Sequence, residues 1–107
     1  MTNVSASIVT VSANSAKLAG DLNMHTVTAI LPQGFALLNQ AKDVWLVDMA
    51  EVKQVSSAAV ALLLEWLKSA EKNGKTLELQ NLPEHMLSII EICGLEPVFT
   101  PLFRTPA

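Results

Sequence analysis

The chain has 107 residues, half of them hydrophobic, with 10 acidic and 7 basic side chains and a formal net charge of −3. This length is typical of one domain, and we expect a single domain over residues 1–107 with its core at about residues 7–100. The acidic balance argues against binding to nucleic acid or to an anionic membrane, both of which need a basic face. The longest wholly apolar run, residues 58–64, is far shorter than the roughly 20 residues of a spanning helix, so a role at a membrane would require a partner.

A single cysteine, Cys93, excludes an internal disulfide. Together with the lack of a signal peptide at the N-terminus, it predicts a protein of the reducing cytoplasm. Cys93 ends the mainly apolar stretch 89–93, so we expect it to be buried rather than reactive.

Residues 7–11 and 17–22 have the composition of two short strands, and residues 13–15 supply turn chemistry between them, which predicts a hairpin. Asn23 is suited to cap a helix. Residues 24–41 carry the apolar positions of a helix but include Pro32 and Gly34. Such a helix either restarts at Pro32 or kinks there, and we expect its main segment at residues 32–40.

The apolar run 44–47 is typical of a central strand and ends at Asp48, after which we expect a short polar connector. Residues 57–73 predict a helix, 76–80 a strand and 84–93 a helix that ends at Gly94. Pro97 and Pro101 limit any strand within residues 95–103 to a short edge strand. This alternation predicts an α/β fold: a mixed, mostly parallel sheet of about four to five strands with helices packed against it.

The helix at residues 57–73 has an unusual outer side. At 100° per residue, one broad face gathers Ala59, Leu62, Leu63, Trp66, Leu67 and Ala70, and we expect it to pack on the sheet. A ridge on or beside the solvent side holds Ser57, Ala61, Leu64 and Lys68, with Ala58 next to it. The ridge is either a docking surface or covered by a loop or the C-terminal tail of this chain.

Two serines begin that helix. Ser56 fits the N-cap position, which leaves the Ser57 side chain free in the first turn. A phosphoryl group on Ser57 would face the positive end of the helix dipole. The other interpretation is that both serines only cap the helix.

No catalytic or metal-binding constellation stands out. His25 and His85 are far apart in sequence, and no Cys-x-x-Cys or His-x-x-x-His spacing occurs. The chain also lacks a Gly-rich phosphate loop, so we expect no ATP hydrolysis, no catalytic residues, no metal and no cofactor. His25 either lies in the turn before the first helix or borders the docking surface.

In four places the chain resembles the STAS domains, a family that includes bacterial anti-sigma-factor antagonists and the cytoplasmic tails of sulfate transporters. Asp48 matches an aspartate that ends a buried strand, and Ser57 matches the serine or threonine that is phosphorylated in the antagonists. Residues 18–22 (Leu-Ala-Gly-Asp-Leu) and 90–95 (Ile-Glu-Ile-Cys-Gly-Leu), followed by Phe99, resemble two further motifs of the family. The resemblance implies the STAS, or anti-sigma-factor antagonist-like, fold.

Within the family, Val60-Ala-Leu-Leu-Leu64 and Pro32 are most similar to the small cytoplasmic STAS subunit of the ABC system that transports phospholipids and maintains outer-membrane lipid asymmetry in Gram-negative bacteria. This likeness implies a non-catalytic accessory subunit that binds the ATPase, held at the inner face of the inner membrane by its complex. The partner-binding residues it implies are Ser56, Ser57, Ala58, Ala61 and Leu64. Lys68 and His25 complete the candidate surface.

The alternative within the family is an antagonist that binds an anti-sigma kinase and is switched by phosphorylation of Ser57. Two departures weaken this alternative. Ser56 replaces the usual aspartate, and Ala58 and Ala59 replace the serine or glycine residues that are common there. Both changes favour permanent docking over a phosphorylation switch.

Overall fold

Each strand of the sheet lies beside the strand that follows it in the chain, so the order is β1-β2-β3-β4. The structure is a computed structural model and describes residues 5–104. β1 (Ala6–Ser12) pairs antiparallel with β2 (Ser15–Leu22), which closes the predicted hairpin. β2 then runs parallel to β3 (Val44–Val55), and β3 runs parallel to β4 (Thr76–Gln80). The sheet is therefore mixed and mostly parallel, as predicted.

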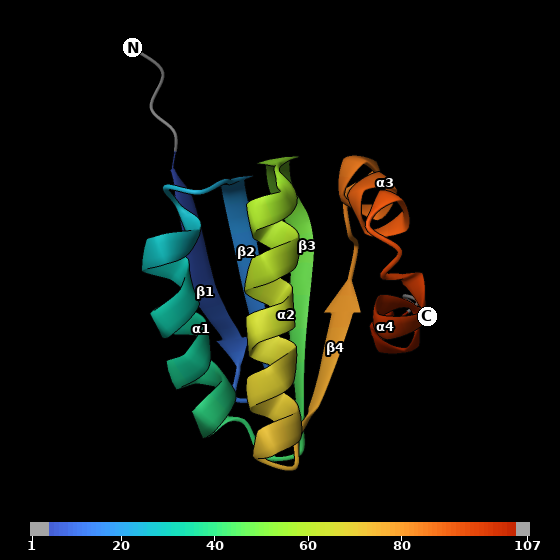
Figure 1. Cartoon of the computed structure of the whole chain (residues 1–107). Coiled ribbons are helices and arrows are strands. Elements are labelled where there is room, and N and C mark those ends of the chain that lie inside the picture. Colours follow the sequence, from blue (N-terminus) through green and yellow to red (C-terminus); the bar gives the residue numbers. More distant parts are fainter. Residues whose placement is uncertain (1–4, 105–107) are drawn as a thin grey trace.

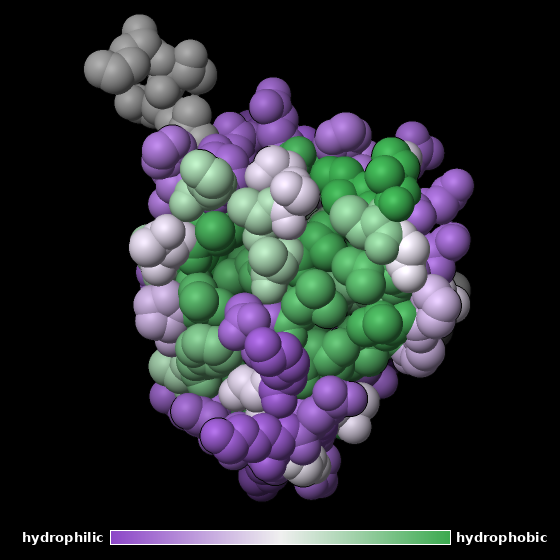
Figure 2. Space-filling model, in the orientation of Figure 1, coloured by the Kyte–Doolittle hydropathy of each residue, from purple (hydrophilic) through white to green (hydrophobic). Residues whose placement is uncertain are grey.

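The helices lie mainly on one face of this sheet (Figure 1). α1 (Val27–Gln40) packs against β1 and α2, and α2 (Ser57–Lys72) packs against β4 and α3. α3 (Glu84–Ile92), α4 (Glu96–Phe99) and the 3-10 turn η1 (Thr100–Leu102) follow at the β4 side of the molecule. Figure 2 shows that this helical face also exposes apolar side chains beside α2.

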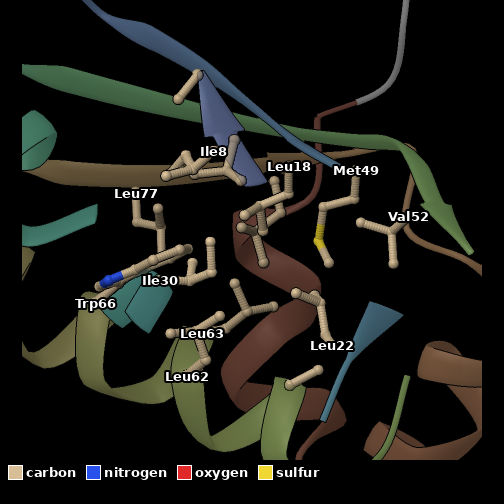
Figure 3. Close-up of a cluster of buried hydrophobic side chains, with 14 of the residues drawn as sticks. Ile8, Leu18, Leu22, Ile30, Met49, Val52, Leu62, Leu63, Trp66 and Leu77 are labelled. Atoms are coloured by element: carbon tan, nitrogen blue, oxygen red, sulfur yellow. The ribbon is translucent and has the colours of Figure 1, made fainter. Parts of the chain in front are cut away.

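The core fills the space between the sheet and α1 and α2. Figure 3 shows Leu18 and Met49 from the strands pointing toward Leu63 and Trp66 of α2. Trp45 and Trp66 meet edge to face, with ring centroids 5.3 Å apart and planes at 76°, an arrangement that adds to the energy of burying both rings. Both tryptophans are buried, and for Trp66 this agrees with the face of the helix predicted to pack on the sheet.

The opposite face of the sheet carries a different set of side chains. Val9 is exposed there, Lys17 and Asp48 are half-buried, and the Lys17 ammonium lies 3.8 Å from a Glu51 carboxylate oxygen. Successive side chains of a strand point to opposite faces, so the strands alternate between core residues and this more polar set. That alternation is typical of a sheet that faces water on one side.

The first helix begins earlier than predicted. α1 starts at Val27 and continues through Pro32, so the expected main segment at residues 32–40 is wrong at its start. Asn23 does not cap the helix directly. Its Oδ1 instead accepts hydrogen bonds from the backbone N–H groups of His25 (2.9 Å) and Thr26 (3.2 Å), and this turn starts the helix upstream of the proline. Ile30, which lies in this first part of the helix, is buried in the core.

The third strand is longer than predicted. β3 continues past Asp48 to Val55, so the polar connector expected after Asp48 is wrong. Its pairing with β2 shifts in register between Asp48 and Glu51, where β3 carries one extra residue. The extra residue places Met49 and Val52 both in the core although they are three positions apart (Figure 3). Because apolar and polar residues do not alternate here, the sequence of this part of β3 does not show the pattern of a strand.

The C-terminal segment also differs from the prediction. Residues 96–102 form α4 and η1 instead of a short strand, since Pro97 and Pro101 each occupy the first turn of a helix, where a missing N–H costs nothing. Within residues 95–104, only Phe103 pairs with the sheet, through a parallel bridge to Leu79 at the β4 edge. Cys93 is exposed at the end of α3, so its predicted burial is wrong.

Gly34 sets how closely α1 approaches α2. A Cβ atom built on Gly34 would lie 2.1 Å from a ring carbon of Trp66, so only glycine lets this indole pack on the α1 backbone. From there the Trp66 Nε1–H donates a hydrogen bond of 3.1 Å to the Leu31 carbonyl oxygen. The indole is thus buried with its single polar group satisfied.

We predict that Gly34→Ala destabilises the protein by about 1–3 kcal/mol, because the added methyl group overpacks the contact with Trp66. In a helix position without this contact, the same change is stabilising. Urea unfolding of the variant and the parent chain measures the difference. Ala36→Ser, at an exposed position of the same helix, should change the free energy of unfolding by less than about 0.5 kcal/mol.

Candidate functional site

The start of α2 is fixed by its N-cap residue. Ser56 has an extended backbone (φ −121°, ψ −178°), and its Oγ accepts a hydrogen bond of 3.2 Å from the backbone N–H of Ala58. The backbone N–H of Ser56 donates to the Leu22 carbonyl oxygen at the end of β2, over 3.0 Å. The predicted N-cap is confirmed, and α2 therefore begins at the edge where β2 and β3 end.

Ser57 occupies the first position of α2 with its side chain free. The residue is exposed, and its hydroxyl makes no hydrogen bond to any other residue within 5–104. Ser56 thus serves the backbone while Ser57 faces solvent. The two serines have separate roles, unlike the interpretation in which both only cap the helix.

The predicted ridge along α2 is open except at one position. Ser57, Ala61 and Lys68 are exposed, and Ala58 is half-buried. Leu64 is half-buried and packs against the core, so it is not the exposed leucine that the helical wheel suggested. No segment of residues 5–104 covers the three exposed positions, and residues 105–107 lie outside the described part of the chain.

A groove runs beside this ridge between α1 and α2. Its volume is about 260 Å³, and its walls are mainly apolar. The lining residues are Val27, Thr28 and Leu31 of α1 and Ala58, Ala61, Leu62 and Glu65 of α2. The groove therefore presents side chains of both helices as one mainly apolar surface.

The sequence did not identify the α1 wall of this groove. The expected main segment at residues 32–40 excludes Val27, Thr28 and Leu31, although residues 24–41 carry the apolar positions of a helix. The spacing of Val27, Ile30 and Leu31, which is three and four residues, was the helical signal available in the sequence.

His25 lies in the turn between β2 and α1, as one of the two interpretations predicted. It is exposed, and this turn shares a small pocket with the beginning of α2, lined by Asp21, Asn23 and Ser56 among others. The β2–α1 turn and the start of α2 are therefore neighbours at one edge of the sheet. No hydrogen bond within residues 5–104 joins the His25 imidazole to α2.

Asp48 lies away from this edge. It is inside β3, on the sheet face opposite to the buried Val47 and Met49, and not at the end of the strand as its motif implied. One carboxylate oxygen accepts hydrogen bonds from the Ala50 backbone N–H (2.9 Å) and from the Asn81 side-chain amide (3.0 Å). Asp48 thus holds the irregular part of β3 and the end of β4 in place.

Other kinds of site are not apparent in residues 5–104. No group of three or more His, Cys, Asp or Glu side chains in this range is placed to hold a metal ion. His85 is exposed in the first turn of α3. In the same range, no helix combines the length and the apolar character needed to cross a membrane.

A family model described as "Mlab, STAS domain" matches residues 9–101, most of the chain. The chain belongs to the STAS domain family. The resemblance to this family is thereby confirmed, and so is the STAS fold. No curated protein sequence matches this STAS domain significantly.

Several solved structures resemble this STAS domain. A chain of the Acinetobacter MlaFEDB complex in its ATP-bound Vtrans1 conformation is 26% identical, with a TM-score of 0.64, and the match covers 74% of this chain and 83% of that one. The anti-sigma-factor antagonist SpoIIAA in its unphosphorylated form is 17% identical (TM-score 0.72; 95% and 88% covered). The Bacillus cell-fate determinant SpoIIAA in its phosphorylated form is 18% identical (TM-score 0.69; 95% and 91% covered). The two SpoIIAA likenesses show the fold.

We predict that Ser56→Ala lowers the free energy of unfolding by about 1 kcal/mol, since it removes the oxygen that caps α2. Ser57→Ala should change it by less than about 0.5 kcal/mol, because the exposed hydroxyl bonds to nothing in the described part of the chain. Urea unfolding of the two variants separates these roles. Equal losses for both serines would contradict the assignment of Ser56 as the cap.

Proposed function

We propose that this STAS domain is a non-catalytic accessory subunit that binds the cytoplasmic ATPase of a phospholipid-transport ABC system, one that maintains outer-membrane lipid asymmetry. The observation that carries the proposal is the open ridge at the start of α2, where Ser57 and Ala61 are exposed beside an apolar groove. The family model named Mlab and the likeness to a chain of the MlaFEDB complex support it.

The chemistry of this surface suits a lasting protein contact. Ala58 and Ala61 are small, so a partner's backbone can approach α2 closely, and the groove can accept an apolar side chain. Interfaces that stay assembled are more apolar than transient ones. Ser56 holds the start of the helix in position, and Lys68 and His25 lie toward the margins, where polar contacts are found in most interfaces.

Binding to this ATPase would determine the location of the protein. A subunit that binds the ATPase would lie in the cytoplasm at the inner face of the inner membrane, held there by the complex. Its own acidic charge does not favour direct contact with anionic lipid.

A pair of matched variants tests the contact. We expect Ala61→Arg to abolish co-purification of the ABC ATPase with the tagged chain, because the long charged side chain fills the ridge and the mouth of the groove. Ala36→Arg makes the same change at an exposed alanine of α1 and should leave co-purification intact. Unchanged recovery of the ATPase with Ala61→Arg would reject this surface as the contact. Leu64→Asp is a poorer choice because Leu64 packs against the core.

A second candidate function is an anti-sigma-factor antagonist that binds an anti-sigma kinase. The free, exposed hydroxyl of Ser57 at the first position of α2 favours it, since a phosphoryl group there would meet the positive end of the helix dipole. The likeness to SpoIIAA is consistent with it.

Intact mass after incubation with the cognate kinase and ATP decides between the two functions. As an ATPase-binding subunit, the chain should gain no phosphoryl group. Addition of one phosphoryl group to the parent chain, absent in Ser57→Ala, would favour the antagonist instead.

A further inference from the structure

Helices α2 and α3 carry an apolar surface beyond the ridge and the groove. Ile92, the last residue of α3, is 84% exposed, although isoleucine is among the residues most often buried. Ile89 lies one turn earlier on the same flank of α3 and is half-buried, as is Leu67 of α2. We call Leu67, Ile89 and Ile92 the α3 surface. Figure 2 shows apolar side chains extending from α2 across the α3 side of the molecule.

Leu67 lies on the flank of α2 away from α1. Ala58, Leu62 and Glu65 occupy the other flank, because they line the groove against α1. At 100° per residue, Val60 and Leu67 fall on the opposite flank, and α3 is the helix that packs on this side of α2. The 3% exposure of Val60 agrees with that cover.

Apart from His85, the ionisable side chains of residues 76–103, which include α3, are acidic or the thiol of Cys93. Residues 76–103 contain four glutamates and no lysine or arginine. Glu78 lies 3.4 Å from the Arg104 guanidinium. Glu84, Glu91 and Glu96 are exposed and form no ion pair within residues 5–104.

The lysines of α2 and of the turn that follows it lie toward α1. Lys68 and Lys72 of α2 line a second hollow with Phe35 and Asn39 of α1, on the side of α2 that faces away from α3. Lys75 donates hydrogen bonds from its ammonium to the carbonyl oxygens of Leu38 (2.8 Å) and Asn39 (2.9 Å), also toward α1. The exposed carboxylates of α3 and α4 therefore have no lysine of α2 beside them, and Ile89 and Ile92 share their flank of α3 with His85.

We propose that the α3 surface binds a protein partner through a face that carries apolar side chains flanked by lysine or arginine. The apolar centre supplies the area whose burial drives association, and the unpaired carboxylates supply the charge complementarity that selects a basic partner. A second copy of this chain would bring a like-charged margin, and an anionic membrane would be repelled. The proposal is independent of the ATPase contact at Ala61, because its first test uses this chain alone.

Two designed peptides test how charge and apolar burial contribute to binding at the α3 surface. Each is an amphipathic helix of about five turns with one leucine face, and the polar face is lysine in one peptide and glutamate in the other. Amide NMR shifts of the labelled chain should place the lysine peptide on α3 and on the adjoining flank of α2. It should bind at least about tenfold more tightly than the glutamate peptide, and added salt should reduce this difference.

Matched variants identify the groups responsible. Ile92→Asn should weaken binding of the lysine peptide, whereas Val9→Asn, at a 54% exposed valine of β1, should not. Glu91→Gln combined with Glu96→Gln should remove most of the preference for the lysine peptide. Equal binding of the two peptides, or unchanged binding by Ile92→Asn, would overturn the proposal. Dimerisation of the chain or adsorption to phosphatidylglycerol vesicles, if lost in Ile92→Asn, would overturn it in favour of a second copy or a membrane.

The natural cysteine reports on occupancy in cells. Cys93 is exposed next to Ile92, so N-ethylmaleimide should alkylate it more slowly in cells than in the purified chain if a partner covers the α3 surface. Ile92→Asn should bring the two rates together. Ala61→Arg should preserve the protection, which separates this surface from the ATPase contact. Equal rates in cells and in the purified parent chain would count against the proposal.

Discussion

The arrangement of the helices depends on the contact between Trp66 and Gly34. The indole packs on the backbone of α1, donates its hydrogen bond to Leu31 and meets Trp45 edge to face, so it joins both helices to the sheet. Interiors are packed as densely as crystals, so a single close contact of this kind fixes where neighbouring elements lie. The groove lined by Leu31 and Ala61 lies between the same two helices, so its width depends on how closely Trp66 lets them approach.

Much of the fold followed from patterns that act locally. Three signals depend only on the conformation that the nearby residues prefer. They are the continuous apolar residues at 44–47, the periodicity of residues 57–73 and the glycines after α2 and α3. Gly74 and Gly94 do adopt positive φ angles, 69° and 71°. Ser56 was identified as a cap for the same reason, because a cap involves only its own helix.

The remaining features depend on contacts between residues distant in sequence. β3 continues past Asp48 because β2 pairs with it as far as Val55, and the two extra residues of β3 hide the alternation. α1 continues through Pro32 because an upstream turn begins the helix and Trp66 packs along it. At Cys93 and Leu64, burial depends on where α3 lies, and no pattern within a single helix encodes that position. The sequence thus predicted that Ser57, Ala61 and Lys68 of α2 are exposed, but the expected main segment of the first helix left out the α1 wall of the groove.

The two hydrogen bonds of Ser56 have a consequence for signalling. Its hydroxyl holds the first turn of α2 and its N–H holds the end of β2, so the backbone beside Ser57 is restrained from both directions. A phosphoryl group on Ser57 would therefore add charge at a position whose neighbouring backbone is already held by two hydrogen bonds. A partner would detect this charge directly, through the steric and electrostatic fit of its own surface to the start of α2.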